Sequence, residues 1–279
     1  MSLTELSAIS PIDGRYRSKT KIFSAFFSEE ALIKYRLEVE IEYFIALCEL
    51  KLPELSDFDP KNFKKLRRLY ENFSTNYASE IKQIEKITNH DVKALEYFVK
   101  KQFDKFKLRK YKEFIHFGLT SQDINNTAIP LSVKKGIEKV YLPMLEKILI
   151  KLKHLVNEYK EIPILSRTHG QPASPSILGK EIQVFVSRIE EQKIMLADIP
   201  YAAKFSGATG NFNAHHVAYP KIDWKNFGEK FVELKLKLKY SYPTTQIEYY
   251  DSFAALCDSV KRINNIIIDL NRDMWQYIS

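Results

Sequence analysis

Glycine is scarce in this sequence, with 8 residues among 279. That scarcity argues against a glycine-rich β-barrel or propeller. Cysteine is scarcer still, and the two that occur, Cys48 and Cys257, both lie in apolar stretches with helical spacing. We expect them to be small core residues in a reducing compartment.

Long hydrophobic runs are also missing from the sequence. The stretch 263–270 is interrupted by Asn264, Asn265 and Asp269, so it lacks the length of a bilayer span. Residues 1–14 lack the apolar run of a signal peptide. From these absences we expect a cytoplasmic protein without a membrane partner.

The excess of basic residues is modest. The formal net charge is +8, and the lysines and arginines are spread along the chain. This favours an anionic ligand and does not require nucleic acid, so no nucleic-acid partner is expected. A non-enzymatic basic helical scaffold is the alternative, but the polar segments are richer in His, Asn and Thr than phosphate contact alone requires.

Apolar residues at helical spacing predict an all-α fold with long helices in a bundle. Residues 1–111 are expected to form a small helical N-terminal domain, and residues 112–279 a long-helix bundle domain. Pro130 and Pro143 predict a kink or a helix start. The last helical pattern is still running at Ser279, so we expect the bundle to be incomplete and the sequence to be the front part of a longer protein. The main predicted helices cover residues 28–50, 92–106, 176–198 and 251–279, with another long helix ending near residue 159.

One polar stretch, residues 166–177, is dense in hydrogen-bonding groups and lies between two helical patterns. It contains His169, and histidine is the side chain best placed to exchange a proton near neutral pH. Pro172 and Pro175 fix φ at two points, so we expect a rigid loop followed by a helix start at Pro175 and Ser176. The alternative is a capped turn with a surface histidine.

Two further polar segments lie nearer the N-terminus. Arg15 follows a turn signal, and it is either solvated on an N-terminal arm or bound to a phosphate or carboxylate. Asn89 and Asp91 fit helix caps, whereas His90 is a poor N-cap and is less well explained by capping.

Another polar segment covers residues 114–126. Thr120 or Ser121 can cap the helix that follows, and Asp123 lies in the positive first turn of that helix. Capping does not explain two adjacent hydroxyls followed by three more polar side chains. His116, between two apolar residues, is either a core histidine or part of a site.

In this order, the polar segments resemble those of the adenylosuccinate lyases, a family of the fumarase/aspartase superfamily. The Thr-Ser-x-Asp-x-x-Asn element is general to the superfamily, whereas Arg-Thr-His-Gly-Gln-Pro and Asp-Gly-Arg-Tyr point to adenylosuccinate lyase rather than to argininosuccinate lyase or fumarase. The resemblance covers the whole chain, and its segments are Asp13-Gly14-Arg15-Tyr16, Thr88-Asn89-His90-Asp91, Thr120 to Asn126, Ser166 to Pro172 and Thr245-Gln246-Ile247-Glu248.

The resemblance implies a β-elimination that releases fumarate. The substrates would be adenylosuccinate, which gives AMP, and the succinyl-aminoimidazole-carboxamide ribotide intermediate of purine biosynthesis. It also implies a homotetramer with shared active sites, and neither a metal nor an organic cofactor. Another lyase of the superfamily, such as argininosuccinate lyase, is the alternative.

By the same resemblance, His169 is the general acid. The family's loop Ser-Ser-x-Met-Pro-x-Lys-x-Asn-Pro, which supplies the catalytic base, does not occur in this sequence. We therefore expect the base to lie beyond Ser279 and these 279 residues alone to be inactive. The implied substrate-binding residues are Arg15, Tyr16, Asn89, His90 and Asp91 on the nucleotide side, Thr120 and Ser121 at the succinyl carboxylate, and Gln246, which helps to orient the substrate, with His116, Thr168 and Gln171 as further candidates.

Overall fold

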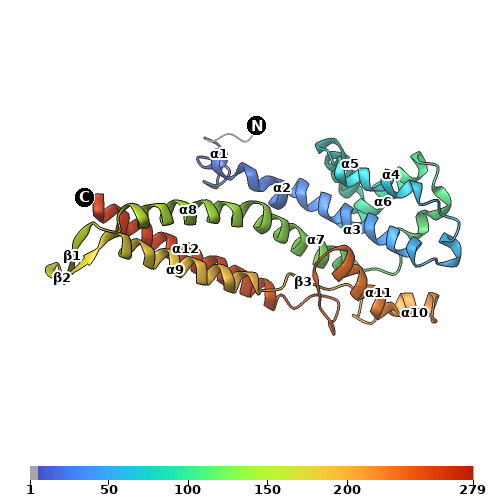
Figure 1. Ribbon diagram of the computed structural model, residues 1–279. Helices are drawn as coiled ribbons and strands as arrows, with labels where there is room; N and C mark the ends of the chain where they lie inside the picture. Colours follow the sequence, from blue (N-terminus) through green and yellow to red (C-terminus); the bar gives the residue numbers. More distant parts are fainter. Residues whose placement is uncertain (1–5, 279) are drawn as a thin grey trace. The chain divides into compact units, whose positions relative to one another are not determined.

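A computed structural model describes residues 6–278. Its contacts divide the chain into two compact units, Met1–Gly136 with Tyr201–Tyr249 (unit 1) and Ile137–Pro200 with Tyr250–Ser279 (unit 2). Helices dominate both units (Figure 1), which confirms the predicted all-α class. Within the described range, no helix is long and apolar enough to cross a membrane.

Unit 1 is built around one long helix, α3 (Glu29–Glu49), which packs against α2, α4, α5, α6 and α7. Two short strands, β3 and β4, pair in parallel within the same unit. The elements of unit 1 are α1 (Arg17–Thr20), η1 (Lys21–Phe23), α2 (Ser24–Phe27), α3, η2 (Pro53–Leu55), α4 (Lys61–Glu71), α5 (Thr75–Thr88), α6 (Asp91–Lys105), η3 (Arg109–Phe114), α7 (Ser121–Gly136), β3 (Ala202–Ala203), α10 (Asn213–Ala218), α11 (Trp224–Lys230), η5 (Phe231–Lys235) and β4 (Lys239–Tyr240).

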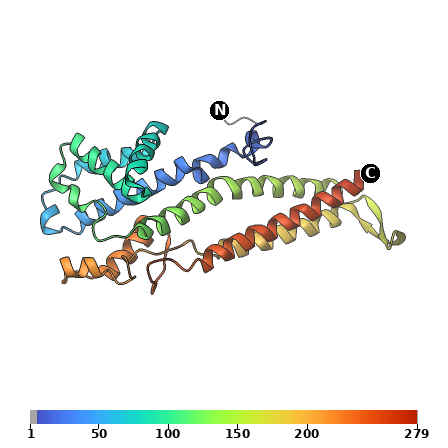
Figure 2. The ribbon, with the colours of Figure 1, turned by 180° about the vertical axis from the view of Figure 1, so that it is seen from behind.

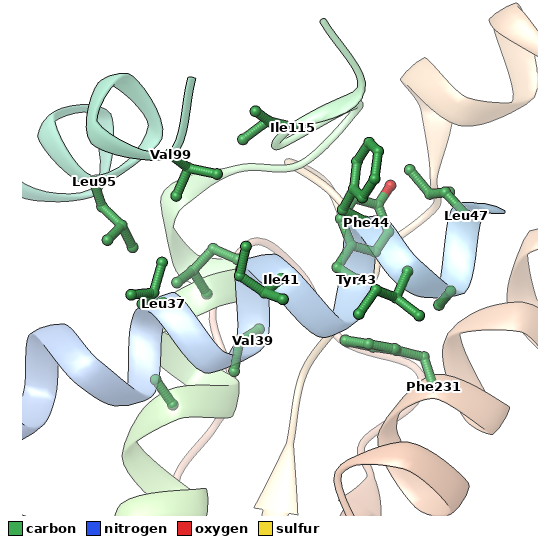
Figure 3. Close-up of a cluster of buried hydrophobic side chains, with 14 of the residues drawn as sticks. Leu37, Val39, Ile41, Tyr43, Phe44, Leu47, Leu95, Val99, Ile115 and Phe231 are labelled. Carbon is green, nitrogen blue, oxygen red and sulfur yellow. The ribbon is translucent and has the colours of Figure 1, made fainter. Parts of the chain in front are cut away.

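The bounds of α3 follow from its sequence and confirm the helix predicted at 28–50. Ser28 is the N-cap, and its hydroxyl accepts a hydrogen bond from the Ala31 amide at 3.1 Å. Apolar residues occupy every face of the helix rather than one stripe, as expected for a helix enclosed by others. Figure 3 shows side chains of α3 meeting Leu95 and Val99 of α6 and Phe231 of η5. The labelled residues of α3 are Leu37, Val39, Ile41, Tyr43, Phe44 and Leu47.

Unit 2 consists of three long helices and a hairpin. The helix α9 packs against both α8 and α12, and the three run side by side in Figures 1 and 2. Pro143 lies in the first turn of α8, which confirms a helix start there, and Pro130 lies inside α7 of unit 1. The elements of unit 2 are η4 (Ile137–Tyr141), α8 (Leu142–Glu158), β1 (Pro163–Thr168), β2 (Gln171–Ile177), α9 (Leu178–Ala197) and α12 (Asp251–Ile278).

The stretch 166–177 is a β-hairpin and not the predicted loop. Strands β1 and β2 pair antiparallel, with Thr168 opposite Gln171, so His169 and Gly170 form the turn. Both turn residues have positive φ, 52° and 76°, as a two-residue hairpin turn of the I′ kind requires. Pro172 and Pro175 are compatible with a two-stranded sheet because both of its strands are edges. The next helix therefore starts at Leu178, not at Pro175 and Ser176.

The two units do not follow the predicted division after residue 111. Residues 112–136 and 201–249 are in contact with the N-terminal helices, because α7 packs along α3 and η5 also contacts α3. The two units are defined by contacts between segments. The predicted domains, 1–111 and 112–279, are regions expected to fold together, and that division stays a prediction.

Candidate functional site

The N-terminal arm presents Arg15 and Tyr16, and both side chains are exposed. The turn before them is closed by backbone hydrogen bonds, from the Gly14 amide to the Ser10 carbonyl at 3.0 Å and from the Tyr16 amide to the Pro11 carbonyl at 2.9 Å. The Arg15 guanidinium carbon lies 5.5 Å from the centre of the Tyr16 ring. The arm therefore offers a cation on a hydrogen-bonded turn.

The segment 88–91 joins α5 to α6; Asn89 and His90 cap these helices, and Asp91 is the first residue of α6. Asn89 ends α5 with a left-handed φ of 50°. His90 is the N-cap of α6, where its Nδ1 accepts a hydrogen bond from the Lys93 amide at 3.2 Å. The expectation that capping would not explain His90 was wrong, because a neutral imidazole nitrogen can serve as the acceptor. A cavity of about 600 Å³ lies at this junction, and Asn89, His90 and Asp91 are among its lining residues.

The start of α7 carries Thr120 and Ser121, which are both half-buried. Their conformation depends on Asp123, which is fully buried and whose Oδ2 accepts a hydrogen bond from the Thr120 amide at 2.8 Å. The other oxygen of Asp123 accepts from the Lys204 ammonium at 2.6 Å and from the amides of Ser206 and Gly207 at 2.8 and 3.0 Å. Asp123 thus fastens the start of α7 to the segment 204–207.

Lys204 is as deeply buried as its partner. Burial lowers the pKa of Lys204, while the charge of Asp123 and its hydrogen bond oppose that change. The predicted position of Asp123 in the first turn of a helix is confirmed. Lys204, however, was not identified from the sequence.

His116 is held by a buried carboxylate that sequence reasoning did not identify. The distance from His116 Nδ1 to Glu40 Oε1 is 2.5 Å, and the His116 side chain is 14% exposed. Burial lowers the pKa of His116, but the charge of Glu40 and its hydrogen bond, with smaller effects from Glu96 and Asp123, outweigh burial and leave the pKa raised. His116 is thus an ion-paired histidine in a loop with left-handed backbone, at φ 58°.

A second histidine, His215, lies fully buried in unit 1 beside the same loop. Its Nε2 is 2.9 Å from the oxygen of the Tyr43 hydroxyl, and that hydroxyl donates its proton to the Phe117 carbonyl at 2.6 Å. Burial lowers the pKa of His215 to about 4. A Cβ atom at Gly118 would lie 2.7 Å from the His215 ring, so the loop and this histidine are closely packed.

The segment with Gln246 contacts the start of α7 through its neighbour. The Glu248 amide donates to Asn126 Oδ1 at 3.0 Å, whereas the Gln246 side chain is exposed. The Gly210 position is in close contact with this segment, because a Cβ atom there would lie 1.9 Å from the Thr244 carbonyl oxygen.

The predicted residues of the 166–177 stretch all lie on the hairpin of unit 2. Thr168, His169 and Gln171 are exposed, with His169 at the turn. The predicted site residues are therefore divided between the units. Unit 1 holds Arg15, Tyr16, Asn89, His90, Asp91, His116, Thr120, Ser121 and Gln246, and unit 2 holds Thr168, His169 and Gln171.

Within unit 1, Arg36 links two of the predicted segments. Its Nη2 lies 2.7 Å from Asp91 Oδ2, and its Nε donates to Asn125 Oδ1 at 2.8 Å. Arg36, Glu40 and Tyr43 are polar residues in an apolar helix at spacings of four and three. That spacing is the signal in the sequence that could have identified them.

A profile of a family described as lyase matches residues 14–279. The chain belongs to this lyase family. The chain is 54% identical to a Dictyostelium discoideum protein named adenylosuccinate lyase, and 46% and 42% identical to proteins of the same name from Legionella pneumophila (strain Corby) and Escherichia coli (strain K12). The resemblance inferred from the motifs is confirmed.

Each of these alignments covers 100% of the chain and 61% of the relative, so the chain spans about three fifths of the length of these lyases. Solved structures share the fold at low sequence identity. A fumarate lyase from Mesorhizobium sp. BNC1 is 18% identical with a TM-score of 0.75, and the match covers 93% of this chain and 57% of that one. A β-carboxy-cis,cis-muconate cycloisomerase from Acinetobacter calcoaceticus sp. ADP1 is 18% identical with a TM-score of 0.69, over 94% and 58%.

Proposed function

We propose that the full-length protein containing this chain is an adenylosuccinate lyase of purine biosynthesis. It would release fumarate from adenylosuccinate, giving AMP, and from the succinyl-aminoimidazole-carboxamide ribotide intermediate. The observation that carries the proposal is the identity of 42–54% to adenylosuccinate lyases along the whole chain. The proposal concerns the full-length protein, because the chain spans 61% of the length of those relatives.

The reaction needs an acid for the leaving nitrogen and donors for the charge that develops on the succinyl carboxylate. We assign the acid role to His169, whose ring is exposed at the tip of the hairpin. Thr120 and Ser121 would hold the succinyl carboxylate. The start of a 16-residue helix supports that role, because the dipole of the helix favours an anion there.

The nucleotide side of the substrate would be bound by the remaining residues of unit 1. The exposed Arg15 supplies a guanidinium for a phosphate or carboxylate. The cavity between α5 and α6 supports a binding role for the three residues that line it there. The assigned residues are Arg15, Tyr16, Asn89, His90 and Asp91, with Gln246 orienting the substrate and His116, Thr168 and Gln171 as further contributors.

We further propose that the protein is a homotetramer in the cytoplasm and that its active sites take residues from different subunits. The helices of unit 2 expose large apolar side chains, which supports an interface on them. Cys48 and Cys257 are both free thiols, in keeping with a reducing compartment, although Cys257 is exposed and is not the core residue expected from the sequence. The exposed large apolar residues on these helices are Met144, Ile148, Ile150, Val184, Ile194, Met195, Phe253, Ile268, Trp275, Tyr277 and Ile278.

The test of the proposal is turnover by the full-length protein. Adenylosuccinate should be cleaved and argininosuccinate should not, measured by the release of fumarate. His169→Ala should lower kcat by roughly two to four orders of magnitude, the usual scale for general acid catalysis, while substrate still binds. His154→Ala is the matched control, because His154 is an exposed histidine of unit 2, in α8. A near wild-type rate for His169→Ala would show that the acid is another group.

Shared sites have their own test. Inactive His169→Ala and Ser121→Ala subunits, mixed and reassembled, should regain part of the activity, because some mixed sites receive only wild-type residues. Mixtures that stay as inactive as the two parents would contradict a site built from several chains.

A further inference from the structure

The central helix of unit 1 carries three polar side chains on one face. Arg36, Glu40 and Tyr43 are spaced by four and three residues, and their exposures are 7%, 1% and 0%. Burying charged groups costs stability unless they are paired. The partners of these side chains therefore indicate what they do.

Each of the three reaches a segment that carries predicted site residues. Arg36 bonds to Asp91 at the start of α6 and to Asn125 in α7. Tyr43 donates to the Phe117 carbonyl, in the loop just before Thr120. These contacts tie the segments 88–91 and 114–126 to a helix that is itself enclosed by the core.

Glu40 makes the most specific of these contacts. Its Oε1 lies 2.5 Å from His116 Nδ1, and its Oε2 has no hydrogen-bond partner among the described residues although it is buried. A carboxylate in that situation is compensated by a positive charge on the imidazole. Because Nδ1 faces Glu40, the ring presents Nε2 on its opposite side.

The backbone at His116 agrees with a fixed orientation. Its φ of 58° lies in the left-handed region, which a non-glycine residue adopts at a cost and which the surrounding contacts must maintain. The carboxylates that act on its charge come from three elements, Glu40 of α3, Glu96 of α6 and Asp123 of α7. Together they favour the imidazolium.

We infer that Arg36, Glu40 and Tyr43 are positioning residues for the site, and that Glu40 orients His116 so that its Nε2–H binds an anionic oxygen of the substrate. The group bound by His116 is an oxyanion of the substrate, either a carboxylate or a phosphate. The inference rests on the proposed function for the identity of the substrate that supplies this oxygen. It assigns Glu40 no contact with the substrate.

The experiment compares two buried glutamates of α3 in the full-length protein. Glu40→Gln keeps the shape of the side chain and removes its charge, and Glu42→Gln is the matched control. Glu42 pairs with Arg67 at 2.7 Å and accepts from the Tyr70 hydroxyl, so both substitutions break a buried polar contact of the same helix. In Glu40→Gln, the NMR titration of His116 should move to lower pH, and KM for adenylosuccinate should rise about tenfold above pH 6.5, with little change in kcat.

The control variant and the binding measurements distinguish a positioning role of Glu40 from a general effect on stability. Glu42→Gln should leave the His116 titration and the dependence of KM on pH unchanged, whatever it does to the unfolding temperature. Weaker binding of fumarate by Glu40→Gln would identify the oxyanion as a carboxylate, and weaker binding of AMP would identify it as a phosphate. If Glu40→Gln lowers the unfolding temperature while KM and the His116 titration stay as in the wild type, the inference is overturned.

If the Glu40→Gln variant does not fold, the inference can still be tested on the wild-type protein. The His116 ring should carry protons on both nitrogens just above about pH 6.5, the ordinary pKa of a histidine side chain, and a neutral His116 ring there would refute the role of Glu40. If the wild type does not cleave adenylosuccinate, the proposed function fails, whereas the His116 titration still decides whether Glu40 holds the imidazolium.

Discussion

Replacing Asp123 by Asn tests how far one buried carboxylate organises unit 1. The substitution preserves the size and shape of the side chain but removes its charge and replaces one acceptor oxygen by a donor. Oδ1 accepts from Lys204, Ser206 and Gly207, and Oδ2 accepts from Thr120. Whichever way the new amide group faces, its NH₂ meets at least one donor.

The magnitude follows from those four contacts. Removing one partner of a buried ion pair costs about 3–5 kcal/mol, which includes the Lys204 charge left without a counter-charge. For a domain of roughly 150–250 residues, each kcal/mol lowers the unfolding temperature by about 2–4 °C. Asp123→Asn should therefore lower the unfolding temperature of unit 1 by about 6–20 °C.

The loss of stability caused by Asp123→Asn should also depend on pH. Without Asp123, burial lowers the pKa of Lys204 further below its unfolded value, so the unfolded chain binds more protons than the folded one. Stability of the variant then rises as pH increases towards the unfolded lysine pKa. The difference from wild type should be larger at pH 6 than at pH 9.

Calorimetry at both pH values measures this effect, and hydrogen exchange of the Thr120, Ser206 and Gly207 amides shows where it acts. Asp258→Asn is a control, because Asp258 pairs with Lys261 on an exposed face and should leave the unfolding temperature unchanged. An Asp123→Asn protein that unfolds within about 2 °C of the wild type would refute the reasoning.

The remaining predictions concern a glycine and a buried histidine. Gly210→Ala should destabilise unit 1 far more than Gly170→Ala destabilises unit 2, as measured by thermal unfolding. Both glycines have positive φ, but only a Cβ atom at Gly210 would meet backbone, 1.9 Å from the Thr244 carbonyl oxygen. Equal losses of stability would contradict this prediction. Stability of unit 1 should fall as pH drops from 6.5 to about 4, by up to about 3 kcal/mol, because the unfolded chain protonates His215 there and the folded chain does not. Urea unfolding at pH 7 and pH 5 checks the slope, and His215→Asn should flatten it.

Much of the helical framework could be predicted because its signals are local. The helix Glu29–Glu49 matches the apolar pattern at 28–50, and Asp251–Ile278 matches the pattern that starts at Asp251. The hairpin was missed because two prolines in a short polar segment argue against a strand in a larger sheet. That argument does not apply where both strands are edges.

The polar contacts that position the predicted residues could not be derived in the same way. Asp123 and Lys204 are 81 residues apart, and Glu40 and His116 are 76 apart, so no local pattern links either pair. His90 shows the opposite case, since its contact with Lys93 is local but uses an acceptor that is uncommon at helix starts.

The tip of the hairpin restricts which amino acids can occupy position 169, independently of any proton transfer. At φ 52°, Asn, Asp and Gly fit the backbone as well as His does, whereas β-branched residues are strained. A saturation library at this position therefore sorts variants by two separate criteria, the geometry of the turn and the chemistry of the ring. His169→Asn would belong to the class that keeps the turn and loses the chemistry, and His169→Val to the class that loses both.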